Sequence, residues 1–112
     1  MVIYRSEYQE RLERAATELA ARIVRNMDPD RVILFGSVAS GDAGPASDVD
    51  LLVIKPSGLT FKERIRRIYA ELDRTTDVDL LWYTPEEVRR LQSSSSFVRH
   101  ALATGRLLYE RR

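Results

Sequence analysis

Two aspartates at the start of an apolar run have the clearest capacity for chemistry in this sequence. Asp48 and Asp50 stand two positions apart and lead directly into Leu51 to Ile54. Side chains with this spacing point to the same face of a strand, with Cα atoms roughly 6–7 Å apart, so the two carboxylates converge. Their charges repel unless a cation lies between them. Oxygen ligands of this kind suit Mg²⁺ or Mn²⁺, which keep coordination positions open for phosphates. The pattern predicts a site for a metal–triphosphate complex.

A small-residue turn, Gly36-Ser37, precedes the two aspartates by ten residues. Gly36 ends an apolar, β-rich run at residues 31–35 that is typical of a buried strand, and glycine permits a close backbone approach to a ligand. Ser37 adds a hydroxyl and opens a polar stretch suited to presenting backbone N–H groups to an anion. The alternative is that all of these residues are structural. Gly36 would then be an ordinary turn glycine, Asp48 would cap a turn, and Asp50 would lie at a solvated strand end. Short motifs often occur by chance, so the sequence leaves this alternative open.

A second Asp-Val-Asp, at residues 77–79, leads into another apolar run that ends at Tyr83. The segment between the two runs has a helix signature and is long enough for a crossover between parallel strands. Neighbouring parallel strands bring Asp79 or Asp77 beside the first pair. Three carboxylates around metal ions stabilise an in-line phosphoryl displacement, and one of them accepts the proton of the nucleophile. A solvated strand start is the alternative, and it suits Asp77 better than Asp79, which lies deeper in the apolar run.

These residues together resemble the minimal nucleotidyltransferases of the DNA polymerase beta superfamily, whose signature is Gly-Ser, ten residues, Asp-x-Asp. Gly36, Ser37, Asp48 and Asp50 match the signature in type and spacing, and Asp79 resembles the third carboxylate of the family. The resemblance implies an α/β (α+β) nucleotidyltransferase fold, a mixed β-sheet with helices packed against it.

The resemblance also implies roles for these residues. Asp48, Asp50 and Asp79 would hold Mg²⁺ or Mn²⁺, with Asp79 also helping to deprotonate the acceptor, and Gly36 and Ser37 would contact the triphosphate of a nucleotide such as ATP. The reaction implied is transfer of a nucleoside monophosphate to a hydroxyl, with release of pyrophosphate.

Many relatives carry basic residues directly after Gly-Ser. Val38 and Ser40 occupy those places here, so a triphosphate contact from arginine at either position is not expected.

Stand-alone members of this family commonly act beside a helical HEPN-domain partner in toxin–antitoxin modules. The resemblance therefore implies an antitoxin that adenylylates a tyrosine of its toxin. One alternative is a stand-alone enzyme that modifies a small molecule such as an aminoglycoside, although such relatives usually carry an additional substrate-binding domain. The other is a catalytically silent module that neutralises its partner by contact alone.

Length, charge and composition agree with this interpretation. A chain of 112 residues is expected to form one domain, residues 1–112, and to share its acceptor site with another chain. A net charge of +1 gives no broad attraction to nucleic acid. The sequence has no cysteine, which excludes disulfides and cysteine zinc sites. No long apolar run or signal-like start is visible, so a cytoplasmic protein without a membrane association is expected.

The remaining sequence predicts a scaffold of amphipathic helices and short strands. Capping-box spacings at Ser6/Gln9, Thr60/Glu63 and Thr84/Glu87 mark three helix starts. The first two helices carry apolar stripes that begin at Tyr8 and Phe61. Ser93–Ser96 is expected to be a loop before a short helix over residues 97–104, with Gly105 after it and a last strand near residues 107–109. The basic residues of the second helix are expected to form a solvated face; they are Lys62, Arg64, Arg66 and Arg67. His100 is not predicted to act as a ligand or base.

Overall fold

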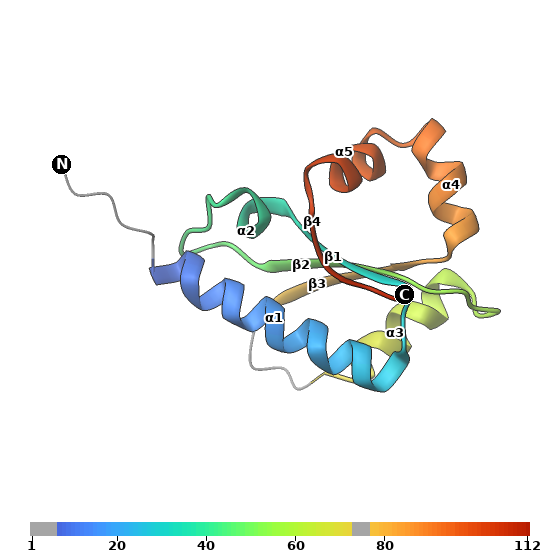
Figure 1. The fold of residues 1–112 in the computed structure, drawn as a ribbon, viewed down its shortest axis with the longest axis horizontal. Coiled ribbons are helices and arrows are strands. Elements are labelled where there is room, and N and C mark those ends of the chain that lie inside the picture. The colour runs from blue at the N-terminus through green and yellow to red at the C-terminus, as the bar shows by residue number, and fades with distance from the viewer. Residues whose placement is uncertain (1–6, 73–76) are drawn as a thin grey trace.

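The computed structural model describes residues 7–72 and 77–112, which form helices packed on both faces of a four-stranded sheet (Figure 1). That residues 1–112 are one domain stays a prediction. The elements in chain order are α1 Glu7–Met27, β1 Arg31–Phe35, α2 Gly36–Ser40, β2 Val49–Ile54, α3 Phe61–Ala70, β3 Val78–Tyr83, α4 Pro85–Ser94, α5 Ser96–Thr104 and β4 Arg106–Glu110.

The sheet has the strand order β3-β2-β1-β4 and is mixed, as expected. Strands β2 and β3 run parallel and are joined by α3, whereas β1 is antiparallel to both β2 and β4. Helices α1 and α3 cover one face of the sheet, and α4 and α5 cover the other (Figure 1). This arrangement places the starts of β2 and β3 side by side at one edge.

Alternation along the strands divides the core between the two faces. In β2, Val49, Leu51 and Val53 pack toward α1 and α3 in the larger cluster, while Leu52 and Ile54 pack toward α4 in the smaller one. All five are buried, and each contributes about 1.5–3 kcal/mol relative to an exposed side chain. A shift of one residue in register would exchange the two faces, so the buried alternation fixes the direction in which the aspartates point.

The capping boxes predicted at Thr60/Glu63 and Thr84/Glu87 are confirmed. Ser6 lies outside the described residues. The apolar stripes extend less far than expected, because Tyr8 and Phe61 are 38% and 40% exposed at the ends of their helices.

The predicted serine loop is wrong. Helix α4 continues to Ser94 and α5 begins at Ser96, so the break is the single residue Ser95. The Ser95 side chain accepts a hydrogen bond from the backbone N–H of Val98 at 3.2 Å. Serine is a favoured N-cap residue, and one cap is sufficient to start a new helix in a new direction.

The prediction of a solvated basic face on α3 is wrong for Arg64. Its side chain is 5% exposed and forms a two-point ion pair with Glu87 of α4, at 2.6 and 3.0 Å. It also donates to the backbone carbonyl of Trp82 at 2.7 Å. The side chain is buried because α3 crosses beneath β3, and Glu87 supplies the compensating charge that a buried guanidinium needs.

Among the described helices, none has an apolar stretch of the length needed to cross a lipid bilayer.

Candidate active site

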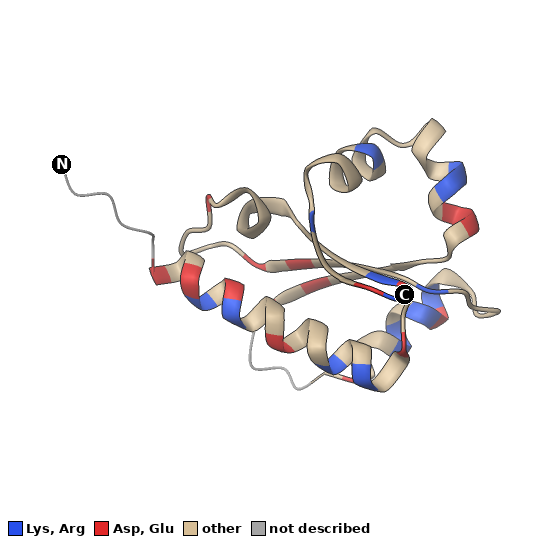
Figure 2. Ribbon diagram, viewed as in Figure 1, with Lys and Arg blue, Asp and Glu red and all other residues tan. Residues whose placement is uncertain are grey.

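Asp50 and Asp79 face each other across the parallel pair of strands. Asp50 of β2 is in register with Asp79 of β3 and, on its other side, with Phe35 of β1. Paired residues of neighbouring strands point to the same face, about 4.8 Å apart. Figure 2 shows the acidic segments of β2 and β3 next to each other. The observed strand register therefore confirms that the crossover brings a carboxylate of β3 next to Asp50.

The electrostatics of Asp50 are those of a crowded carboxylate. Burial, and then the nearby Asp79 and Asp48, raise the pKa of Asp50 from its usual value of 3.8 to about 6. Asp79 is also close enough for the two carboxyl groups to share a hydrogen bond when one of them is protonated. A proton thus stabilises this pair in the absence of another cation.

Gly36 approaches Asp50 more closely than any other residue type would permit. Its φ is +75°, and a Cβ built there would lie 2.2 Å from Oδ2 of Asp50. Both the left-handed backbone and the contact require glycine. The turn after β1 is therefore packed directly on the carboxylate, which places the two halves of the sequence signature against each other.

We expect Gly36→Ala to reduce the activity of this site by at least about 100-fold, because the new Cβ displaces Asp50. The left-handed backbone adds a stability cost of roughly 1–2 kcal/mol. Gly41→Ala is the matched control: Gly41 has φ +85°, but apart from Gly41 and its two chain neighbours no atom of the described residues lies within 4 Å of the position that a Cβ would take there. Initial rates and thermal melts of both variants check this. Equal losses of activity would show that backbone strain, and not the Asp50 contact, accounts for the effect.

Hydrogen bonds connect the turn to the loop that carries Asp48. The Ser37 hydroxyl donates to Oγ of Ser47 at 3.0 Å, and the backbone N–H of Gly44 donates to the same oxygen at 2.9 Å. Ser47 directly precedes Asp48. Ser37 therefore helps to order the loop that leads to Asp48.

Gln9 of α1 holds the segment after Gly36 in place through hydrogen bonds, a role that the sequence did not reveal. Its side chain is 2% exposed, donates to the Val38 carbonyl at 2.8 Å and accepts from the Ala43 N–H at 3.0 Å. The spacing to Ser6 predicts a capping box for Gln9, which is not tested because Ser6 lies outside the described residues. The Gln9 amide bonds to Val38 and Ala43, about thirty positions away, and no local pattern signals these contacts.

A cavity of about 590 Å³ opens beside the acid pair, between α5 and the end of β1. It contains Asp50 and Gly36, together with aromatic and basic side chains from α5. Phe97 is half exposed and makes an edge-on contact with Phe35 at 5.6 Å between ring centroids. His100, for which no role was predicted, is the one described residue lining this cavity that can become cationic.

Other residues near the sequence motifs take different positions relative to this site. Val38 is fully buried, so its position belongs to the core, whereas Ser40 lines the cavity. Lys55 follows β2 at the end opposite to Asp50. Trp82 is buried and donates its indole N–H to the Lys55 carbonyl at 2.9 Å, so it belongs to the core. Asp77 is exposed just before β3.

The acid site fits a divalent cation in its donor chemistry. Hard carboxylate oxygens and a like-charged pair with a raised pKa are features that Mg²⁺ or Mn²⁺ would stabilise. Within residues 7–72 and 77–112, no three acidic, histidine or cysteine side chains already converge as a metal site. Asp50 and Asp79 form the pair, and Asp48 is near enough to affect the pKa of Asp50.

Comparisons with known proteins agree with this geometry. A family model described as polymerase beta, nucleotidyltransferase matches residues 17–112. Among curated proteins there is no significant match.

Solved structures share the fold. One is a proposed nucleotidyltransferase from Sulfolobus solfataricus, with a TM-score of 0.69 and 21% identity over 94% of this chain and 86% of that chain. A toxin–antitoxin structure with AMP-PNP has a TM-score of 0.54 and 24% identity over 86% of this chain and 74% of that chain. A mutant of the toxin–antitoxin MntA-HpeT, with two Asp-to-Glu substitutions, has a TM-score of 0.56 and 20% identity over 87% and 74%. Because the sequence identities are low, these likenesses show a common fold and nothing further about this chain.

Proposed function

Because this chain belongs to the polymerase beta nucleotidyltransferase family, we propose that it transfers AMP from ATP to a hydroxyl group and releases pyrophosphate. The observation that carries the proposal is the register of Asp50 with Asp79, with Gly36 packed against Asp50. A small-residue turn beside paired carboxylates is what a triphosphate–metal complex requires.

The proposed roles of the chain's own residues follow from where they lie. Asp48, Asp50 and Asp79 would hold Mg²⁺ or Mn²⁺, which would neutralise phosphate oxygens and stabilise the attacking and leaving oxygens. Asp79 is the more exposed of the strand pair, which supports the proposed role of taking the proton of the incoming hydroxyl. The new bond joins that oxygen to the α-phosphorus, and the bond to pyrophosphate breaks. Gly36 and the Ser37 backbone face the triphosphate.

The cavity beside Asp50 suits the nucleoside part of the donor. Its volume of about 590 Å³ lies within the range of ligand pockets, and the half-exposed Phe97 ring offers a surface on which a base can stack. His100 supplies a positive charge near the phosphates when protonated. His100 would thereby take the role of the basic residues that many relatives carry at the positions of Val38 and Ser40.

We further propose that the acceptor is a tyrosine of a helical HEPN-domain toxin, and that this chain is the antitoxin. Two structures of the same fold are toxin–antitoxin complexes, and one of them contains AMP-PNP. The other carries two Asp-to-Glu substitutions two positions apart, the spacing of Asp48 and Asp50. These likenesses support the module interpretation over modification of a small molecule.

Intact-mass spectrometry of the proposed HEPN-domain partner, to be sought among the products of the neighbouring genes, tests the proposal. After incubation with this chain, Mg²⁺ and ATP, we expect its mass to rise by one or more AMP units. Asp48→Asn should abolish the gain, because a metal ligand is lost. CTP, GTP and UTP in separate reactions establish the nucleotide preference.

The controls separate catalysis from binding. Chelation of divalent ions should abolish the mass gain in the wild-type protein. A stable complex of the two proteins with no mass gain under any triphosphate would contradict the transferase proposal and favour a silent binding antitoxin.

A further inference from the structure

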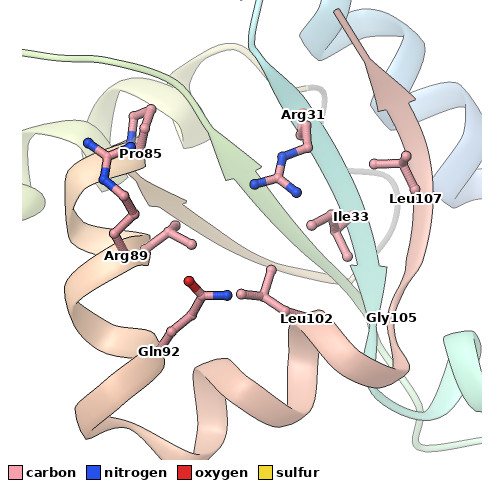
Figure 3. A pocket seen from close by; sticks show the side chains of 9 residues that line it. Arg31, Ile33, Pro85, Arg89, Gln92, Leu102, Gly105 and Leu107 are labelled. Carbon is pink, nitrogen blue, oxygen red and sulfur yellow. The ribbon is translucent and has the colours of Figure 1, made fainter.

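A second pocket lies on the same face of the sheet as the acid pair but toward the opposite end of β1. Its volume is about 400 Å³. Helix α4 forms one wall, and the other is built by β1, the end of α5 and β4 (Figure 3). Among the described residues, it shares none of its lining with the cavity beside Asp50. The lining residues are Arg31, Ile33, Pro85, Val88, Arg89, Gln92, Leu102, Gly105 and Leu107.

The pocket combines an apolar floor with a cationic and amide rim. Ile33 and Leu102 lie at its base, and Leu107 beside them is 52% exposed. Figure 3 shows Arg31 extending from β1 toward α4, and Gln92 extending from α4 toward Leu102. Arg89 is exposed on the same helix wall. None of the described residues that line the pocket is acidic.

The two arginines of this pocket differ from the paired arginines of the fold. Arg64, Arg106 and Arg111 each have a carboxylate within 4 Å. In the part of the chain that the structure describes, Arg31 and Arg89 have no such ion pair. Arg31 is only partly exposed.

The carboxylate of Glu110, which lies near Arg31, does not neutralise the Arg31 guanidinium. Glu110 stands opposite Arg31 in the β1–β4 register, but the two side chains do not form an ion pair. A partly desolvated guanidinium without a counterion favours the binding of an external anion.

We propose that this pocket binds a small organic anion, a phosphate or carboxylate group carried on an apolar body. The Arg31 guanidinium would contact two oxygens of the anion in a fork geometry, and the flexible Arg89 side chain would close over it. The Gln92 amide would donate a further hydrogen bond. The apolar body would cover Ile33, Leu102 and the exposed Leu107. The site needs neither the aspartates nor a metal ion, so it stands apart from the proposed transfer reaction.

Titration of ¹⁵N-labelled protein with phenyl phosphate, in the presence of EDTA, tests the proposal by NMR. We expect saturable shifts of the backbone amides of Gln92, Leu102 and Leu107. Arg31→Gln and Arg89→Gln should each weaken binding about tenfold, the loss of one charge-assisted contact. Arg90→Gln is the matched control, because Arg90 is exposed on the same helix but does not line the pocket.

Three further ligands test separately the charge of the anion, its apolar body, and whether it belongs to a small molecule or to a protein. Phenol lacks the charge and inorganic phosphate lacks the apolar body, so each should bind at least about tenfold more weakly than phenyl phosphate. A peptide with glutamate beside leucine tests whether the anion belongs to a protein. Tighter binding of that peptide through Arg31 and Arg89 would overturn the assignment to a small molecule.

Two other results would overturn the site itself. One is the absence of saturation by roughly 10 mM phenyl phosphate, a concentration at which even weak specific ligands saturate. The other is an equal loss of affinity in Arg90→Gln, which would show general attraction to a basic surface. Thermal melts of the three variants verify that each remains folded.

Discussion

Asp50→Asn is expected to abolish nucleotidyl transfer while making the metal-free protein more stable. The loss of activity should be on the order of 1,000-fold or more, which corresponds to about 4 kcal/mol of transition-state stabilisation. The gain in stability arises because the pKa of Asp50 is raised to about 6, so ionisation of this carboxylate costs the folded state free energy. Since Asp50 is only half-buried, we expect about 1 kcal/mol at pH 7. Transfer rates and denaturant titrations measure both effects.

The stability difference between the wild-type protein and Asp50→Asn should depend on pH. Asp50 ionises near pH 3.8 in the unfolded chain and near pH 6 in the folded one. The wild-type protein should therefore lose stability relative to Asp50→Asn as the pH rises from about 4 through 6, and the two should be equally stable below pH 4. Addition of Mg²⁺ with ATP should raise the melting temperature of the wild-type protein alone.

Asp77→Asn is the control for the acid set. Asp77 is exposed before β3 begins, whereas Asp79 is in register with Asp50. The control should keep most of the metal-dependent stabilisation. If Asp77→Asn removed it and Asp79→Asn did not, the assignment of the third carboxylate would be wrong.

Local patterns in the sequence were sufficient to predict the positions of the candidate catalytic residues. Period-two alternation predicts that Asp48 and Asp50 share one face of a strand, and a crossover helix predicts that the next strand is parallel. In the structure Asp50 lies in β2, whereas Asp48 directly precedes this strand. These two rules predict that Asp79 or Asp77 lies beside the first pair, and the observed register pairs Asp79 with Asp50. The two aspartates are far apart in sequence, but each lies near the start of its own strand, and the parallel crossover is sufficient to bring those starts together.

Long-range contacts were not predictable in the same way. Gln9 fits a capping box by spacing, yet its amide bonds to Val38 and Ala43. His100 carries no local signal, and only the packing of α5 brings it to the cavity beside Asp50. Gly105 was expected as a helix C′ residue, but its φ of −70° is ordinary. Glycine is needed there because a Cβ would lie 2.4 Å from the Ala101 carbonyl oxygen.

Replacement of Arg64 should destabilise the fold strongly, because its side chain is buried and joins α3 to α4. Arg64→Leu leaves the Glu87 carboxylate, 21% exposed, without its partner and leaves the Trp82 carbonyl without a donor. Removing one member of a buried ion pair costs about 3 kcal/mol or more, which is about 15 °C in melting temperature for a domain of this size. Arg66→Leu, an exposed change on the same helix, should alter stability by less than about 0.5 kcal/mol. Thermal and urea unfolding of both variants provide the measurement.

The cause of that loss can be isolated, because Glu87 also belongs to the Thr84 capping box. Glu87→Gln keeps the box, since glutamine serves the same N3 position, and removes only the charge. The double variant Arg64→Leu/Glu87→Gln should therefore recover part of the stability lost by Arg64→Leu. The hydrogen bond from Arg64 lowers the pKa of Glu87 from 4.5 to about 2. The stability difference between wild type and Arg64→Leu should accordingly be full above pH 4.5 and shrink as the pH falls toward 2. A difference that stays constant over this range would assign the loss to packing of the Arg64 stem and not to the ion pair that joins α3 to α4.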